Sequence, residues 1–219
     1  MSGRAGMGML EIRNLYKNFG PLVAVDDVSF TVSRGEVLGF LGPNGAGKST
    51  TMKMITGFLA PSAGTAVICG ADIRERPLAA RRQFGYLPEG APAYPDMTVA
   101  DFLSFVARIR GFRGKDAAAR IARGVELVHL GEVRQQRIDT LSKGFRRRVG
   151  VAQALIHDPP VIILDEPTDG LDPNQKYEMR SILAAMQAEK AIIISTHLLE
   201  EVEAVCSRAI IIARGRILV

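Results

Sequence analysis

The sequence predicts an α/β fold, with a mainly parallel sheet, an antiparallel β part near the N-terminus and an inserted α-helical subdomain. Short apolar runs such as residues 161–164 have the length of buried strands, and helical patterns lie between them. This alternation stops near residue 90 and resumes near residue 150. With 219 residues, 47% of them apolar, the chain is long enough to bury a substantial core.

We therefore expect a single domain over residues 1–219. Its core is predicted to consist of residues 10–89 and 150–219, and the helical insert of residues 90–149. No repeat or low-complexity linker separates the two parts, so the insert is expected to be a subdomain rather than a tethered domain.

The elements before the insert follow from local patterns. A helix is expected over residues 49–59, ended by the helix breakers Pro61, Ser62 and Gly64. Alternating or short apolar runs predict strands at residues 10–15, 28–32, 37–41, 65–68 and 84–87.

In the insert, Thr98 and Asp101 have the spacing of a capping box at a helix start. Residues 116–130 also have a helical pattern. After the insert, strands are predicted at residues 161–165 and 191–195, with a helix between them that starts at Asp172 and Pro173. The apolar faces of the first and last of these helices are Val99, Phe102, Val106 and Ile109, and Met179, Ile182, Leu183 and Met186.

The composition excludes several classes of protein. No apolar run approaches the roughly 20 residues of a membrane-spanning helix, and the first residues lack the apolar core of a signal peptide. Cys69 and Cys206 lie far apart with no CxxC pattern, which favours a reducing compartment over a disulfide framework or a zinc site. We therefore expect a cytoplasmic protein.

The net charge of +5 is unevenly distributed. Residues 101–149 hold 12 Lys and Arg against 5 Asp and Glu, so the insert is strongly basic. Such a segment suits nucleic acid, an anionic lipid surface or an acidic partner, and it equally suits a solvated helical surface.

The strongest functional signal is a glycine-rich loop between the strand at 37–41 and the helix that follows. Its sequence fits the pattern GxxxxGK[ST], in which glycines let backbone N–H groups wrap phosphate oxygens at a helix N-terminus. Lys48 can reach the β and γ phosphates, and the Ser49 hydroxyl can bind Mg²⁺. This predicts a nucleoside-triphosphate site of the P-loop type, built from Gly42, Pro43, Asn44, Gly45, Ala46, Gly47, Lys48, Ser49 and Thr50.

Two carboxylates follow a buried strand that ends at Asp165. Open parallel sheets place ligands at the C-terminal ends of their strands, so Asp165 can hold Mg²⁺ through water while Glu166 orients an attacking water. The alternative is that both residues only cap the next turn. The phosphate loop elsewhere in the chain makes that alternative minor.

His197 follows the strand at 191–195 and is expected near the same sheet edge, in contact with the γ-phosphate. A lone histidine in such a place is more often structural. His129 and His157 have no comparable setting and are assigned structural roles.

Residues 142–144 open another helix, with an apolar face formed by Phe145, Val149, Ala152 and Ile156. Its N-terminus is a second potential anion site. If two copies pair head-to-tail, each copy could complete the other's nucleotide site, although the spacing alone does not prove a dimer.

In order, the motifs resemble those of the ATP-binding cassette (ABC) ATPases. They are GPNGAGKST at 42–50, YLPE at 86–89, LSKGF at 141–145, IILDEPTDGLD at 162–172 and STH at 195–197. The resemblance covers essentially residues 10–219. It implies a RecA-like P-loop core, ATP and Mg²⁺ as cofactors, and ATP hydrolysis to ADP and phosphate coupled to transport.

The resemblance also implies roles for single residues. Lys48, Glu166 and His197 would be catalytic, and Ser49, Asp165 and Glu89 would hold the metal. Phe19 would stack on adenine, with ordinary core packing as its alternative. Two cassettes of the family sandwich two ATP molecules, so Ser142 and Gly144 would contact the ATP bound to the partner copy. The loop at 170–172 would also meet the partner copy.

Two departures from the family pattern place the chain near one branch. Glu89 stands where most cassettes have glutamine, and the signature motif has the sequence LSKGF rather than LSGGQ. Both departures resemble the branch of type-2 exporters that includes gliding-motility and multidrug systems.

The predicted function is therefore the ATP-hydrolysing subunit of an exporter. It would act as a homodimer in the ATP-bound state, with a separate transmembrane permease and peripheral contact with the cytoplasmic face of the membrane, and without nucleic acid. The surface around Glu89 and residues 90–110, stiffened by Pro88, Pro92 and Pro95, is predicted to dock a cytoplasmic helix of the permease.

Two alternatives remain. One is a soluble ABC ATPase acting on nucleic acid or ribosomes, which the basic insert would suit, although the chain has neither long heptad segments nor a second cassette. The other is a nucleotide-binding switch that does not hydrolyse, against which the intact Lys48, Asp165, Glu166 and His197 weigh.

Overall fold

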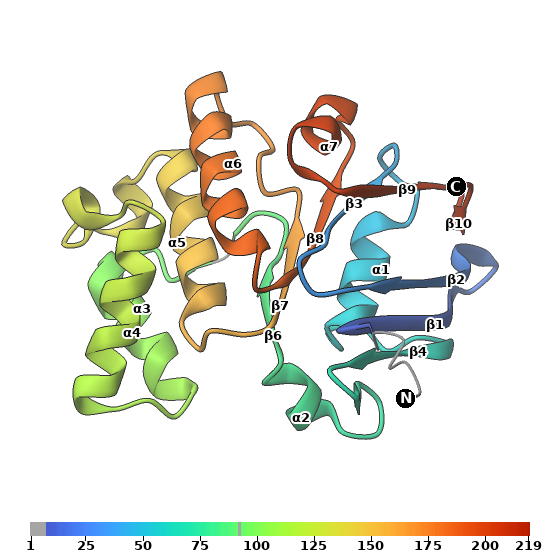
Figure 1. Cartoon of the computed structure of the whole chain (residues 1–219), viewed down its shortest axis with the longest axis horizontal. Coiled ribbons are helices and arrows are strands. Elements are labelled where there is room, and N and C mark those ends of the chain that lie inside the picture. Colours follow the sequence, from blue (N-terminus) through green and yellow to red (C-terminus); the bar gives the residue numbers. More distant parts are fainter. Residues whose placement is uncertain (1–7, 92) are drawn as a thin grey trace, which may run out of the picture.

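The computed structural model describes residues 8–91 and 93–219. Residues 1–7 and Pro92, one of the three prolines of the predicted docking stretch, lie outside the described residues. The described part contains two sheets, with helices packed around them. The helical insert lies on one side of the central sheet, and the antiparallel strands lie on the other (Figure 1).

The N-terminal sheet is antiparallel, as predicted. β1 (Leu10–Phe19) pairs with β2 (Leu22–Val32) on one side and with β4 (Ala63–Ile68) on the other, and β5 (Ala71–Asp72) extends the sheet beyond β4. β1 and β2 are longer than their alternation predicts because they continue into a hairpin around Gly20, whose φ of 58° suits glycine.

The central sheet has the strand order β10-β9-β3-β8-β7-β6. All neighbouring pairs are parallel except the edge strand β10, which runs antiparallel to β9. The strands are β3 (Val37–Leu41), β6 (Phe84–Leu87), β7 (Val161–Asp165), β8 (Ala191–Thr196), β9 (Arg208–Ala213) and β10 (Arg216–Ile217).

Both faces of the central sheet are covered, which explains why its strands are apolar at consecutive positions. On β7, Ile162 and Leu164 pack with the helical insert, while Val161 and Ile163 pack with α1 (Lys48–Ile55) and the antiparallel strands. Figure 1 shows these layers on the two sides of the sheet.

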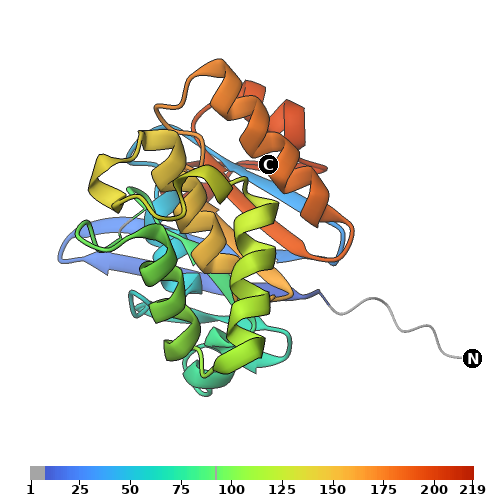
Figure 2. The same cartoon turned by 90° about the vertical axis from the view of Figure 1, so that its left-hand side faces the viewer.

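The remaining helices belong either to the core around the central sheet or to the helical insert. α2 (Pro77–Arg81) leads into β6, α6 (Pro173–Gln187) covers the insert side of the sheet, and α7 (Leu199–Val205) follows β8. The insert consists of α3 (Val99–Ile109), α4 (Gly114–Leu127), α5 (Lys143–Leu155) and the short 3₁₀ turns Gly131–Val133 and Ile138–Thr140, which Figure 2 shows in front.

Three predicted helix starts are confirmed by side-chain caps. Thr98 accepts a hydrogen bond from the backbone N–H of Asp101 at 3.1 Å, and Ser142 accepts one from Phe145 at 3.3 Å. At α6, Asp172 accepts from the backbone N–H of Gln175 at 3.0 Å, and Pro173 occupies the first turn. Such caps satisfy backbone N–H groups that have no partner within the helix.

Some boundaries differ from the sequence prediction. α1 ends at Ile55 rather than residue 59, because the Thr56 hydroxyl bonds the carbonyl of Met52 and Gly57 turns the chain with a φ of 66°. The helix predicted at 116–130 spans Gly114–Leu127. Ile109, predicted on the apolar face of α3, is 68% exposed because the helix ends there, away from the core.

The boundary predicted at residues 149 and 150 lies in the middle of α5. Residues of α3, α4 and α5 form one apolar cluster with Leu164 of β7 and Ile194 of β8, so the insert and the sheet share a core. In the described ranges, no helix combines the length and apolar character needed to cross a membrane.

Candidate active site

The phosphate loop connects the end of β3 to the start of α1. A Cβ atom at position 42 would lie 2.3 Å from the carbonyl oxygen of Ile212, and one at position 47 would lie 2.6 Å from that of Ala24. Gly47 also has a φ of 104°, which side chains rarely adopt. Glycine is therefore required at both positions for the loop to fit between its neighbours and expose its backbone N–H groups.

Lys48 lies on the floor of the site and is 5% exposed. Its Nζ donates to the carbonyl oxygen of Gly42 at 2.7 Å and lies 3.3 Å from Oε1 of Glu166. The ammonium group is thus held beside the phosphate loop by groups of the chain itself, where it can meet phosphate charge.

Asp165 is fully buried at the end of β7. Its Oδ1 accepts hydrogen bonds from Ser195 and, at 3.2 Å, from Ser49. Its Oδ2 is buried without a hydrogen-bond partner among the described residues. Mg²⁺ prefers oxygen ligands, and the site offers the unpaired carboxylate oxygen of Asp165 beside the hydroxyl of Ser49. These residues therefore fit the metal that the phosphate loop implies.

Glu166 directs its carboxylate into the site from an unusual backbone conformation. Its φ is 49°, and its backbone N–H is held by the carbonyl and hydroxyl oxygens of Ser195, both at 3.1 Å. The carboxylate lies between Lys48 and His197, whose Nδ1 is 3.0 Å from Oε2. Strained backbone of this kind is typical of functional sites, because the surroundings must impose it.

Lys48, Ser49 and Glu166 line a cavity of about 330 Å³, whose lining does not include the buried Asp165. The predicted catalytic residues Lys48, Glu166 and His197 all line it, and so does Glu89. The full lining is Asn44, Gly45, Gly47, Lys48, Ser49, Thr50, Glu89, Glu166, Asp169 and His197.

Asp169 is a site residue that the sequence analysis did not single out. It follows Glu166 by three residues in the loop before α6, and Lys143 of α5 donates to its Oδ2 at 3.0 Å. That hydrogen bond lowers the pKa of the Asp169 carboxyl. An acidic residue in the loop after the two carboxylates was the available signal, but its partner is 26 residues away in sequence.

Tyr86 on β6 lies between the acidic groups of the site. Burial and the charges of Asp165 and Glu89 raise the pKa of its hydroxyl. That hydroxyl has no hydrogen-bond partner among the described residues. Tyr86 therefore remains a neutral group behind the metal carboxylate.

Seven predicted site residues are not among those that line this cavity: Phe19, Gly42, Pro43, Ala46, Ser142, Gly144 and Asp165. Four of them belong to the phosphate loop or, in the case of Asp165, accept a hydrogen bond from its Ser49, while Phe19, Ser142 and Gly144 lie on other elements. Phe19 lies at the β1–β2 hairpin, 48% exposed, with Nζ of Lys17 at 5.2 Å from its ring centroid. Ser142 and Gly144 lie at the start of α5, where a Cβ at position 144 would come within 2.6 Å of the Gln175 side chain. The structure places the phosphate loop and the two carboxylates together but sets the signature motif apart.

The chain is similar to known ABC transporter ATP-binding proteins. The family model described as "ABC transporter" matches residues 25–169. A relative named Nod factor export ATP-binding protein I, from Burkholderia lata, is 40% identical over 208 residues, which cover 94% of this chain and 68% of the relative. A probable multidrug ABC transporter ATP-binding protein, YbhF of Escherichia coli, is 36% identical over 219 residues, covering 100% of this chain and 38% of YbhF.

The fold is similar to a solved structure described as the dimeric structure of a bacterial ABC transporter cassette. The TM-score is 0.87 and the identity 23%, over 96% of this chain and 97% of that chain. The chain therefore belongs to the family of ABC transporter ATP-binding domains. It is an ATPase that binds ATP, and in this family ATP hydrolysis is coupled to transport.

Proposed function

We propose that this chain is the ATP-hydrolysing subunit of a membrane exporter and works as a homodimer that closes around two ATP molecules. The observation that carries the proposal is a division within the chain. The groups for binding and hydrolysis share one cavity, whereas the signature motif lies outside it. A second copy placed head-to-tail would bring that motif to the cavity.

The geometry of the site supports a proposed role for each residue. Backbone N–H groups of the phosphate loop and Lys48 bind the phosphates, while Ser49, Asp165 and Glu89 would hold Mg²⁺, which would neutralise phosphate charge. Glu166 orients the attacking water and accepts its proton, and His197 holds the Glu166 carboxylate in place from 3.0 Å.

The surface of the α5 N-terminus supports the dimer. Ser142 and Lys143 are exposed, and the first turn of α5 offers backbone N–H groups and a favourable dipole to an anion. The phosphate groups of ATP bound to the partner copy are negatively charged and accept hydrogen bonds, so they could bind there. The similarity to a dimeric cassette structure is consistent with this arrangement.

The exporter assignment is supported by the branch features and by the relatives. Glu89 and the signature sequence LSKGF depart from the common cassette pattern. One relative is named for Nod factor export and another for multidrug transport. We assign this chain to the same type of exporter and place it peripherally at the cytoplasmic face of the membrane, without a role for nucleic acid.

The permease is proposed to dock on the surface around Glu89 and residues 90–110. This surface holds exposed aromatic and apolar groups, since Tyr94 is 54% and Ile109 68% exposed. The Tyr94 ring packs edge-on against Phe105 at 5.4 Å, which gives the patch a fixed aromatic centre.

The test is affinity purification of the tagged chain from detergent-solubilised membranes, with nuclease treatment before elution. We expect a multispanning membrane protein to copurify in stoichiometric amount and to survive the nuclease. Copurification of ribosomes or nucleic acid instead, abolished by nuclease, would contradict the exporter proposal.

A further inference from the structure

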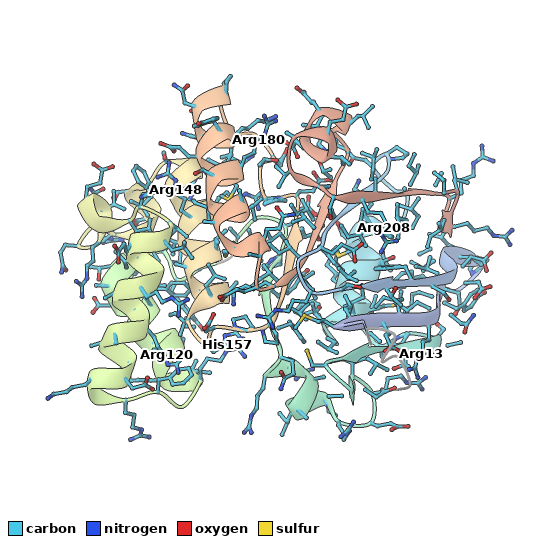
Figure 3. All side chains as sticks on the ribbon, in the orientation of Figure 1. Arg13, Arg120, Arg148, His157, Arg180 and Arg208 are labelled. Atoms are coloured by element: carbon cyan, nitrogen blue, oxygen red, sulfur yellow. The ribbon has the colours of Figure 1, made fainter. Side chains whose placement is uncertain are left out.

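Three consecutive arginines of α5 have three different surroundings. Arg146 is exposed. Arg148, labelled in Figure 3, belongs to α5. It forms an ion pair with Glu178 of α6 and stacks over Phe145, with its guanidinium carbon 5.1 Å from the ring centroid. Arg147 is 3% exposed and points toward Asp169, in the loop of its own chain that runs from Glu166 to Asp172. The middle arginine therefore has a role that its neighbours do not share.

Arg147 faces the acidic end of the nucleotide cavity. Its Nη2 lies 3.9 Å from Oδ2 of Asp169, a cavity-lining residue. Burial lowers the pKa of the guanidinium, and the charges of Asp169, Glu89, Asp165 and Glu166 oppose that effect. Arg147 itself does not line the cavity, so it acts behind these carboxylates rather than on the nucleotide.

A second cation of α5 points to the same carboxylate. Lys143 lies four residues before Arg147, on the same helix face, and its Nζ is 3.0 Å from Oδ2 of Asp169. The Lys143 side chain lies over Gly170 of the same loop, where a Cβ would come within 2.0 Å of its Nζ. The first two turns of α5 thus hold the loop between Glu166 and Asp172.

The buried guanidinium of Arg147 is incompletely paired. Its Nη1 has no hydrogen-bond partner among the described residues, and the same holds for Oγ1 of Thr168 and Oδ2 of Asp165. A buried, incompletely paired charge is costly in a fold that needs it only for packing. Such a charge is more readily explained by a demand of the site than by the stability of the helix.

We propose that Arg147 is a positioning residue for ATP hydrolysis, which holds the loop that carries Glu166 and Asp169 from the signature helix of the same chain. The signature motif at the start of α5 and the carboxylate that orients the water then move as one unit. The proposal rests on hydrolysis by this site and does not depend on the exporter assignment.

A positioning role differs measurably from a structural one. Within residues 8–91 and 93–219, no hydrogen bond or ion pair joins Arg147 to the phosphate loop. We therefore expect loss of the guanidinium to leave ATP binding intact while Glu166 loses its placement. Misplacement of a catalytic group by about 1 Å costs up to about 100-fold in rate. We therefore expect Arg147→Met to lower kcat by about 10- to 100-fold with KM changed less than about 3-fold.

Arg148→Met is the matched control, because it removes a second buried cation from the same helix. It breaks the ion pair with Glu178 and leaves the contacts to Asp169 in place. We expect it to lower Tm by as much as Arg147→Met and to keep kcat within about 2-fold of wild type. Arg147→Lys restores the charge but not the planar fork, so it should recover part of the lost kcat.

The decisive experiment measures steady-state ATP hydrolysis of these variants together with Asp169→Asn and the Arg147→Met/Asp169→Asn double variant. The proposal predicts that the double variant is no slower than the slower single one, because both act through one contact. Multiplicative effects, or an equal loss of kcat in Arg148→Met, would overturn it.

Amide hydrogen exchange provides a readout that does not need turnover. The amides of Asp169 and Leu171, which bond the carbonyls of Glu166 and Thr168, should exchange faster in Arg147→Met than in Arg148→Met. Unchanged exchange at both amides in Arg147→Met would show that the guanidinium does not hold the loop.

Discussion

Two helix N-termini of this chain have the same local chemistry but different surroundings. The start of α1 lies in a cavity with a 5% exposed lysine and two buried carboxylates. The start of α5 is capped by Ser142, is exposed, and lines no part of that cavity. The proposed dimer accounts for this difference, because the exposed N-terminus of α5 would meet the ATP bound to the partner copy.

The largest expected effect concerns the site at the start of α1. Glu166→Gln keeps the shape of the side chain but removes the charge that orients water, so turnover should fall by about 10²- to 10⁴-fold. ATP binding should persist, because the phosphate loop is untouched. The measurement is steady-state phosphate release beside equilibrium ATP binding, and near-normal turnover would remove Glu166 from this role.

Lys48→Ala should act at the binding step. It deletes the cation that faces the phosphates and leaves the buried Glu166 carboxylate without its partner at 3.3 Å. Charge-assisted hydrogen bonds contribute about 1.5–3 kcal/mol, so affinity for ATP should fall by about 10- to 100-fold. Titration with a fluorescent ATP analogue measures this loss.

Lys48→Arg is the matched variant for that experiment. The planar guanidinium differs from a compact ammonium, so it should restore affinity only in part. A Lys48→Ala protein that binds ATP like wild type would contradict the role of Lys48 in binding the phosphates.

A crosslinking experiment tests whether the proposed docking surface, around Glu89 and residues 90–110, contacts a membrane protein. Single cysteines at positions 93–97, in a background with Cys69 and Cys206 changed to serine, should crosslink to the copurifying membrane protein. A cysteine at Gly20 on the β1–β2 hairpin is the control and should not. Strong crosslinks from Gly20 with none from 93–97 would move the docking surface off the insert.

The smallest effect concerns a histidine outside the site. Nε2 of His157 lies 3.0 Å from the carbonyl oxygen of Phe84, and burial first, then Arg110, lowers the pKa of its ring to about 4. The unfolded chain binds the proton near pH 6.5. Stability is therefore full above pH 6.5 and is lost as the pH falls toward 4, since protons favour the unfolded chain.

His157→Gln should flatten that decline, because glutamine can donate to the same carbonyl without titrating. Thermal melts of both proteins between pH 7 and 4 measure the difference. Parallel melting curves over that range would show that His157 does not titrate on unfolding.

The site at the start of α1 was more predictable than the start of α5, for a physical reason. The spacing of Gly42, Gly47 and Lys48 constrains the backbone locally, so a pattern in sequence predicts a structure directly. Asp169 and Arg147 acquire their roles only through contact between α5 and a distant loop, which no local pattern encodes. The end of α1 was also predicted wrongly, although its causes are local: the Thr56 hydroxyl bonds the carbonyl of Met52, and Gly57 turns the chain with a φ of 66°.

The measurement that tests the central claim most directly is the solution mass of Glu166→Gln with saturating Mg²⁺ and ATP. The claim predicts about twice the 23.7 kDa of one chain, and a return to one chain when Ser142→Arg is added, with ATP still bound. A mass of 23.7 kDa for the ATP-saturated single variant would contradict the claim that two copies complete each other's sites. So would a dimer that persists unchanged with Ser142→Arg.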